Sequence, residues 1–180
     1  MKYILSLFFI AGLLLSANAQ QLDSKYKVSL GGELLSAFGS TAEFYGMGYG
    51  GSLQAEYSLS SKLNVTLSGG YVSVEVSKRY KDIFTPWGYV PKNTVVYPAK
   101  AGLKYNFYKK YYAAAEGGMA ISKDKGVRGN SFAYAGGVGT NFEISNKTSI
   151  DVGLRFEEWA VSSTDRLSFV GLRAAYVFGF

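Results

Sequence analysis

The side chains able to do acid–base chemistry in this chain are carboxylates, because the sequence contains no His and no Cys. This composition excludes the commonest general base, thiolate nucleophiles, disulfides and the usual zinc sites. Glu157, Glu158 and Asp165 could act as general acids or bases, but no nucleophile and base are spaced to meet around them. Solvated loop carboxylates are therefore the simpler interpretation, and the sequence predicts no enzyme, no cofactor and no metal site.

A second set of charged residues lies on the polar face of the predicted strands. The alternate positions of these strands are apolar and form the opposite face. If the apolar face contacts lipid, these charges point into an interior, where they must be paired. If the apolar face forms a soluble core instead, the same charges are ordinary solvated residues. The five basic and six acidic members are Lys27, Lys100, Lys104, Arg155 and Arg173, and Glu33, Glu56, Glu116, Glu143, Asp151 and Glu157.

The elements that carry these charges are predicted to be strands, since alternation with period two runs from Lys25 to the end of the chain. Eight such segments are present, and their connections alternate in length. In a transmembrane barrel, short turns connect the strands at one end and longer loops connect them at the other. The predicted turns are 60–62, 108–110 and 145–147, and the predicted loops are 36–48, 77–94, 122–130 and 158–166.

This pattern predicts an all-β fold, an eight-stranded antiparallel transmembrane up-and-down barrel with short periplasmic turns and longer extracellular loops. Aromatic residues near the strand ends form two candidate interfacial girdles. The alternative is a secreted soluble β-barrel or sandwich that binds an apolar ligand. The predicted girdles are Tyr57, Tyr105, Phe107, Tyr111, Phe142, Phe178 and Phe180 near the turns, and Tyr49, Tyr71, Tyr97, Phe132 and Trp159 near the loops.

The first 19 residues have the pattern of a secretory signal. Lys2 is followed by an apolar stretch over 4–15, and Ala17-Asn18-Ala19 provides a small-x-small cleavage site before Gln20. A membrane anchor helix is the alternative, although the apolar stretch is short for one. We expect residues 1–19 to be a signal peptide and residues 20–180 to form one barrel domain.

Two segments resemble the small outer-membrane β-barrel families, of the OmpA-transmembrane and OmpX-like type and the wider "outer membrane protein beta-barrel domain" group. The segment 173–180 resembles their C-terminal assembly signal through Tyr176, Phe178 and Phe180, and departs from it at Ala175, where Gly is usual. The segment 97–107 looks like the fourth strand of that group. The resemblance implies the outer membrane of a Gram-negative bacterium, surrounding lipid, and assembly by the barrel-assembly machinery.

An eight-stranded barrel has an interior just wide enough for side chains, so the paired charges predict a plugged lumen with negligible conductance rather than a narrow small-solute pore. The loop 77–94 is basic and aromatic, which suggests contact with lipopolysaccharide phosphates or with an acidic host or matrix ligand. A solvated loop without a ligand is the alternative, and nucleic acid is not expected. The loop residues concerned are Lys78, Arg79, Lys81, Trp87 and Lys92.

The apolar phase of one segment inverts after Gly69-Gly70, so that Val72, Val74 and Val76 take the parity held earlier by polar residues. A Gly-Gly bulge would produce this change. Such a bulge would re-register the rim of the barrel, or would begin a protruding hairpin with a free edge for a partner strand.

Overall fold

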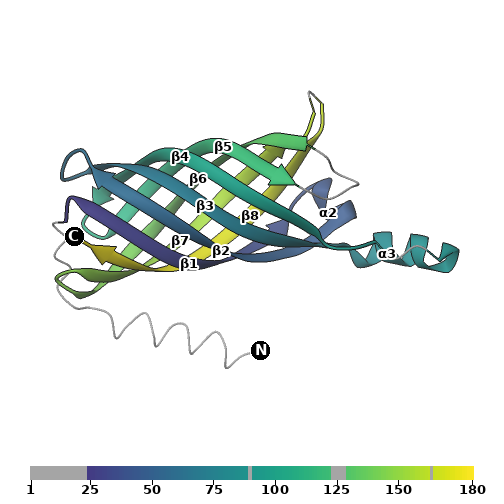
Figure 1. Cartoon of the computed structure of the whole chain (residues 1–180), viewed down its shortest axis with the longest axis horizontal. Helices are drawn as coiled ribbons and strands as arrows, with labels where there is room; N and C mark the ends of the chain where they lie inside the picture. The colour runs from purple at the N-terminus through teal and green to yellow at the C-terminus, as the bar shows by residue number, and fades with distance from the viewer. Residues whose placement is uncertain (1–23, 89–90, 123–128, 163) are drawn as a thin grey trace.

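The eight segments with alternating residues form the strands of one closed sheet. Every strand pairs with its neighbours in sequence, and β1 pairs with β8 (Figure 1). The structure is a computed structural model that describes residues 24–88, 91–122, 129–162 and 164–180, so the predicted signal peptide lies outside the described residues. The predicted eight-stranded antiparallel barrel is confirmed. Its strands are β1 (Tyr26–Ala37), β2 (Tyr45–Ser58), β3 (Leu63–Val76), β4 (Thr94–Tyr108), β5 (Tyr111–Ser122), β6 (Gly129–Ser145), β7 (Thr148–Ala160) and β8 (Arg166–Gly179).

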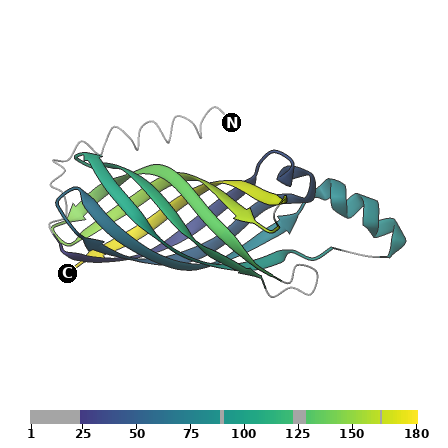
Figure 2. The same cartoon turned by 90° about the horizontal axis from the view of Figure 1, so that it is seen from above.

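The two ends of the barrel differ as the connection lengths predict. Short turns join β2 to β3, β4 to β5 and β6 to β7 at the end where the chain also finishes, which we call the turn end (Figure 1). The opposite loop end carries three short helical segments: α2 (Thr41–Phe44), α3 (Lys78–Phe84) and the 3-10 turn η1 (Thr85–Trp87). Figure 2 shows α3 projecting well beyond the strands. In barrels of this kind the turns are periplasmic and the loops extracellular.

The exterior of the barrel is apolar over most of its height. Leu30, Leu53 and Leu67 point outward with 64%, 56% and 64% of their surface exposed, while the uncharged polar residues and the glycine beside them in sequence share the inward face with the charged residues. This is the parity of a lipid-facing barrel, so the soluble alternative, which required apolar residues inside and charges outside, is wrong. Among the described residues no helix is long and apolar enough to cross a membrane.

The predicted bulge at Gly69-Gly70 is wrong. β3 keeps one register with β2 from Val74 to Asn64, without a shift at these glycines, and its register with β4 is the same on either side of them. The valines after the glycines are buried inside the barrel. The apolar phase inverts because the interior itself changes from polar to apolar at this height, while the strand stays straight.

The predicted protruding hairpin is also wrong. Near the loop end β3 still pairs with β2, through Val76 and Tyr45, and β4 still pairs with β5, through Val96 and Ser122. Both strands are therefore paired on both sides almost to their ends, and at the loop end Thr94 and Val95 of β4 and the last two residues of β3 are paired on one side or fewer. Beyond the last β3–β4 pair, Val74 with Thr94, the chain forms α3, which begins after Ser77.

Candidate functional site

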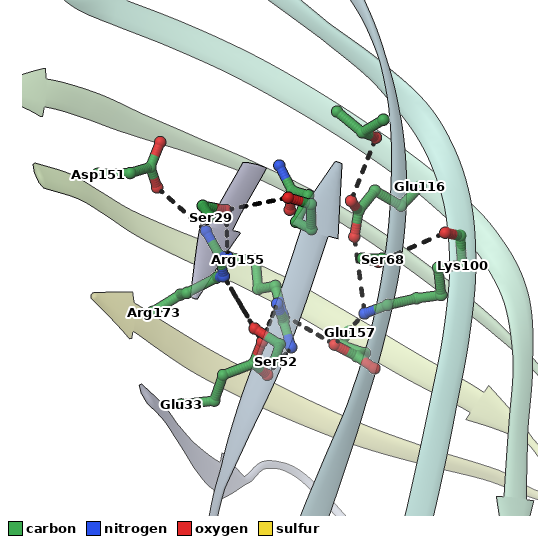
Figure 3. A network of polar contacts seen from close by, with 12 residues as sticks. Ser29, Glu33, Ser52, Ser68, Lys100, Glu116, Asp151, Arg155, Glu157 and Arg173 are labelled. Atoms are coloured by element: carbon green, nitrogen blue, oxygen red, sulfur yellow. Dashed lines mark hydrogen bonds and ion pairs between the residues drawn. The ribbon is translucent and has the colours of Figure 1, made fainter. Parts of the chain in front are cut away.

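The predicted charged residues all lie on the inward face of the strands, and together they form the charged layer of the barrel interior. Figure 3 shows the part of this layer around Arg155, Arg173 and Lys100. Eight of the eleven are buried, and Glu116, Glu143 and Arg155 are half-buried. Their side chains come from strands around the whole barrel and meet across its centre. The arrangement leaves most charges within ion-pair distance of an opposite charge, as burial requires.

Lys104 lies at the centre of the part of the charged layer that is nearer the turn end. Its ammonium lies 2.9 Å from Glu56 and 2.9 Å from Asp151, and its side chain is only 4% exposed. Tyr112, which the sequence analysis missed, packs its ring 4.1 Å from the Lys104 ammonium and donates a 2.8 Å hydrogen bond to Asp151. Tyr112 shares its face of β5 with Glu116, so strand parity could have placed it inside.

Two arginines hold the middle of the charged layer. Arg155 on β7 reaches past β8 to Glu33 on β1, at 2.5 Å, and also lies 2.8 Å from Glu157. Arg173 donates hydrogen bonds to the hydroxyls of Ser52 and Ser29, at 3.0 and 2.8 Å, and its guanidinium is 3.7 Å from Glu33. These serines were not predicted, because a hydroxyl carries no charge signal in the sequence.

Glycines on the inward face leave the space that these long side chains occupy. A Cβ atom at Gly171 would lie 2.8 Å from the Leu35 side chain and 3.2 Å from that of Arg155. A Cβ atom at Gly153 would lie 2.8 Å from the Tyr112 hydroxyl. The interior therefore requires small residues opposite large ones, as expected for a barrel that side chains fill.

Above the charged layer, toward the loop end, the interior is apolar. We call this cluster the apolar cap. Its Trp159 and Phe169 rings are 4.6 Å apart, and both side chains are almost fully buried. This part of the interior therefore holds packed hydrocarbon rather than ion pairs. Its buried members are Leu35, Val72, Val74, Val96, Ala120, Ala133, Trp159 and Phe169.

Trp159 joins the two layers. It was predicted to be an interfacial girdle residue, but its side chain points inward and is 3% exposed. The prediction failed because Trp159 has the same parity as Glu157, two residues earlier, and therefore the same inward face. Its indole N–H donates a 2.8 Å hydrogen bond to Glu157, which also accepts a 2.8 Å bond from Lys100.

The other predicted girdle residues lie on the exterior face. Tyr49, Tyr71, Tyr97 and Phe132 are exposed toward the loop end. The predicted assembly residues Tyr176, Phe178 and Phe180 also point outward at the turn end, where Tyr26, Tyr105, Phe107 and Tyr111 are exposed beside them.

The three carboxylates considered for acid–base chemistry do not converge. Glu157 faces the lumen, whereas Glu158 points to the exterior, where Ser168 and Tyr134 donate hydrogen bonds to it. Asp165 accepts a 2.8 Å hydrogen bond from Ser162 within the β7–β8 connection. Adjacent strand residues face opposite sides of the sheet, which explains why Glu157 and Glu158 cannot act on one substrate.

The basic residues predicted for the β3–β4 loop are distributed along an exposed projection. Lys78 and Arg79 on α3 and Lys92 after η1 are exposed, and Lys81 is half-exposed. The side chain of Trp87 and the basic residues of 123–128 lie outside the described residues. The Ser77 hydroxyl caps α3 by accepting from the backbone N–H of Tyr80 and donates to the Glu43 carbonyl at 2.6 Å.

Cavities between these side chains are small. One at the centre of the charged layer, beside Tyr112 and Arg173, has a volume of about 50 Å³. Another at the turn end, beside Lys27, Glu56 and Glu143, and a third in the apolar cap each measure about 20 Å³. Volumes of this size accommodate a few water molecules at most.

The sequence matches no protein-family model and no curated protein. Its structure is similar to neisserial surface protein A, at 15% identity and a TM-score of 0.62, over 87% of this chain and 98% of that one. It is also similar to the outer membrane protein OprG of Pseudomonas aeruginosa, at 11% identity and a TM-score of 0.55, over 91% and 99%.

The Yersinia pestis outer membrane protein Ail in a phospholipid bilayer nanodisc is similar at 15% identity and a TM-score of 0.53, over 87% of this chain and 100% of that one. These similarities confirm the resemblance to small outer-membrane barrels at the level of the fold. The chain is an outer-membrane type β-barrel that crosses a bilayer with its strands, and this fold together with its apolar exterior indicates an outer-membrane location.

Proposed function

We propose that the protein is a non-enzymatic barrel of the Gram-negative outer membrane, closed by its own side chains, whose role is to present the β3–β4 loop at the cell surface. The observation that carries this proposal is the two-layered interior: ion pairs fill the lower lumen and packed apolar side chains fill the upper lumen. Such an interior stabilises a scaffold and leaves no path for solutes wider than water.

The projecting loop supports a role in surface interaction. No residue of α3 is buried, so the helix contributes little to the barrel itself. Phe44 on α2 contacts Tyr80, and Tyr80 contacts Phe84, with ring centroids 5.7 and 4.7 Å apart. These contacts fix the direction of α3 while its basic residues stay exposed. The fitting partners are lipopolysaccharide phosphates or an acidic host or matrix surface.

The location proposed here also requires export and assembly. We infer that residues 1–19 are removed as a signal peptide and that the barrel-assembly machinery recognises Tyr176, Phe178 and Phe180. The outward position of these three side chains on β8 supports that inference, since a recognition signal must be accessible before the barrel closes.

Two measurements test the proposal. Purified protein in planar bilayers should show negligible single-channel current, and large stable currents would contradict the plugged lumen. Replacement of Lys78, Arg79, Lys81 and Lys92 by Gln should reduce lipopolysaccharide retention or cell adhesion. Replacement of Lys62, Lys109, Lys110 and Lys147 by Gln removes equal charge from the opposite end and serves as the matched control. If both variants behave like the wild type, the loop has no such role.

A further inference from the structure

The turn end of the barrel carries a ring of lysines, which we call the rim lysines. One lies at the start of β1 and the others lie in the three turns, so that they surround the mouth of the barrel. Four are exposed and Lys110 is half-buried, and none of them forms an ion pair with a described residue. The rim lysines are Lys25, Lys62, Lys109, Lys110 and Lys147.

No acidic side chain balances this ring at the surface. The described acidic side chains at the turn end, Glu56 and Glu143, are buried and half-buried respectively and line the cavity inside the mouth. At the loop end, by contrast, described basic and acidic residues are equal in number, five of each, which cancels their net charge. They are Lys78, Arg79, Lys81, Lys92 and Arg166, and Glu43, Glu75, Asp82, Glu158 and Asp165.

Aromatic rings hold the rim lysines at a defined height. The ammonium of Lys25 lies 5.5 Å from the Tyr57 ring, that of Lys109 lies 6.0 Å from Tyr108, and that of Lys110 lies 5.7 Å from Tyr111. Exposed Tyr and Phe rings in a barrel lie at the level where hydrocarbon meets head groups. Ammonium groups stacked on these rings therefore lie at the level of the lipid phosphates.

Hydrogen bonds also fix the backbone of the rim. The carbonyls of Lys25, Lys62, Lys110 and Lys147 each accept a backbone hydrogen bond from the neighbouring strand, at 2.7 to 2.9 Å. Lys109 has a φ of 36°, a conformation that favours Gly or Asn. The turn therefore keeps a cation where backbone geometry alone would favour another residue, which points to a role for the charge.

We propose that the rim lysines form a binding surface for anionic phospholipid head groups of the periplasmic leaflet, with phosphatidylglycerol as the representative ligand. The exposed ammonium groups of the rim offer contacts to lipid phosphates, and the aromatic rings beside Lys25, Lys109 and Lys110 contact the glycerol and upper acyl chains. The surface enriches anionic lipid around the turn end and sets how deeply the barrel sits in the bilayer.

The test uses the full folded chain in nanodiscs made from equal parts of phosphatidylcholine and phosphatidylglycerol. Native mass spectrometry measures which lipids remain bound to the released barrel. We expect roughly tenfold enrichment of phosphatidylglycerol on the wild type, lost when Lys62, Lys109, Lys110 and Lys147 become Gln. Arg166→Gln, which removes an exposed cation at the loop end but outside the β3–β4 loop, should keep the enrichment.

Two further arms separate the lipid from other anions. Arg at the same four rim positions should preserve the enrichment, and inorganic phosphate in excess should leave it unchanged, because a free phosphate lacks the acyl chains that contact the rings. Equal lipid ratios on the wild type and the rim Gln variant would overturn the proposal. So would loss of cosedimentation with purified peptidoglycan in the rim Gln variant at unchanged lipid ratios, since the partner would then be the cell wall.

Discussion

The charged layer and the apolar cap fill the same barrel by different physical means. In the charged layer, Lys104 is almost fully buried between Glu56 and Asp151, each 2.9 Å away. In the apolar cap, Leu35 and Val74 are each 1% exposed and pack within a cluster of buried apolar side chains. Charges taken out of water depend on each particular partner, whereas apolar side chains depend on total volume and shape.

The exterior changes together with the interior. Around the charged layer the outer face is apolar, but near the apolar cap Glu75 on β3, Glu158 on β7 and Arg166 on β8 interrupt it. The upper part of the barrel thus begins to resemble a soluble barrel, with a hydrocarbon core and a polar surface. The difference indicates that the strands emerge from the hydrocarbon region of the membrane near the height of the cap.

The largest expected effect is at Lys104. Replacement by Ala leaves Glu56 and Asp151 buried without this cation, so we expect the free energy of unfolding to fall by about 3–5 kcal/mol. Lys104→Met, which keeps most of the volume, should lose nearly as much if charge pairing governs this layer. Urea titration of the barrel in lipid vesicles measures both. A Met variant as stable as the wild type would mean that volume governs the charged layer too.

Leu35→Ala tests the apolar cap by removing volume without changing charge. We expect a loss of about 3 kcal/mol in the free energy of unfolding, because a buried Leu leaves a cavity that the rigid sheet cannot close. Leu30→Ala on the lipid-facing side of the same strand is the matched control and should cost much less. Equal losses at the two positions would show that the cap is not closely packed.

Val74→Thr keeps the volume of the cap but buries a hydroxyl in place of a methyl group. We expect a cost of about 1–2 kcal/mol for burying this group, measured by the same urea titration.

The same substitution in reverse, Thr66→Val in the charged layer, removes a hydroxyl that donates to Glu116 at 3.3 Å. It should cost about 1 kcal/mol, and a gain in stability there would break the contrast between the layers.

Trp159→Phe separates the link between the layers from the packing of the cap. It removes the indole N–H that donates to Glu157 but retains an aromatic ring beside Phe169. Because Glu157 keeps Lys100 and Arg155 as partners, the expected loss is only about 1 kcal/mol. Trp159→Ala, which also empties the cap, should lose several times more, and similar losses for both would assign the whole effect to the hydrogen bond.

The strands and the inward position of the charges could be predicted from sequence because alternation is a local signal. Lys100 and Lys104, for example, share a parity on β4 whatever the rest of the chain does. The apolar cap could not be predicted, since an inversion such as that at Val72 is produced equally by a bulge or by a change of surroundings. Only pairing with β2 and β4 distinguishes the two, and pairing is a long-range property.

The sequence also could not predict which residues pair with each charge. Arg155 and Glu33 are 122 positions apart and meet only because barrel closure places β1 and β7 on either side of β8. Hydroxyl and aromatic partners such as Ser52 and Tyr112 carry no charge pattern that would draw attention to them. Trp159 was predicted on the wrong face because the preference of Trp for membrane interfaces was given more weight than its position in the strand alternation.

The pairing of β1 with β8 bears on how the molecule is made. Backbone hydrogen bonds join these strands as far as Phe180, whose N–H donates to the Tyr26 carbonyl. Until β8 arrives, the growing sheet has two unsatisfied edges, which would pair with other chains. Pairing of β1 with β8 joins the two ends of the chain, so we expect it to be a late and slow step of folding. A chaperone that covers the open edges would then be needed until the barrel closes.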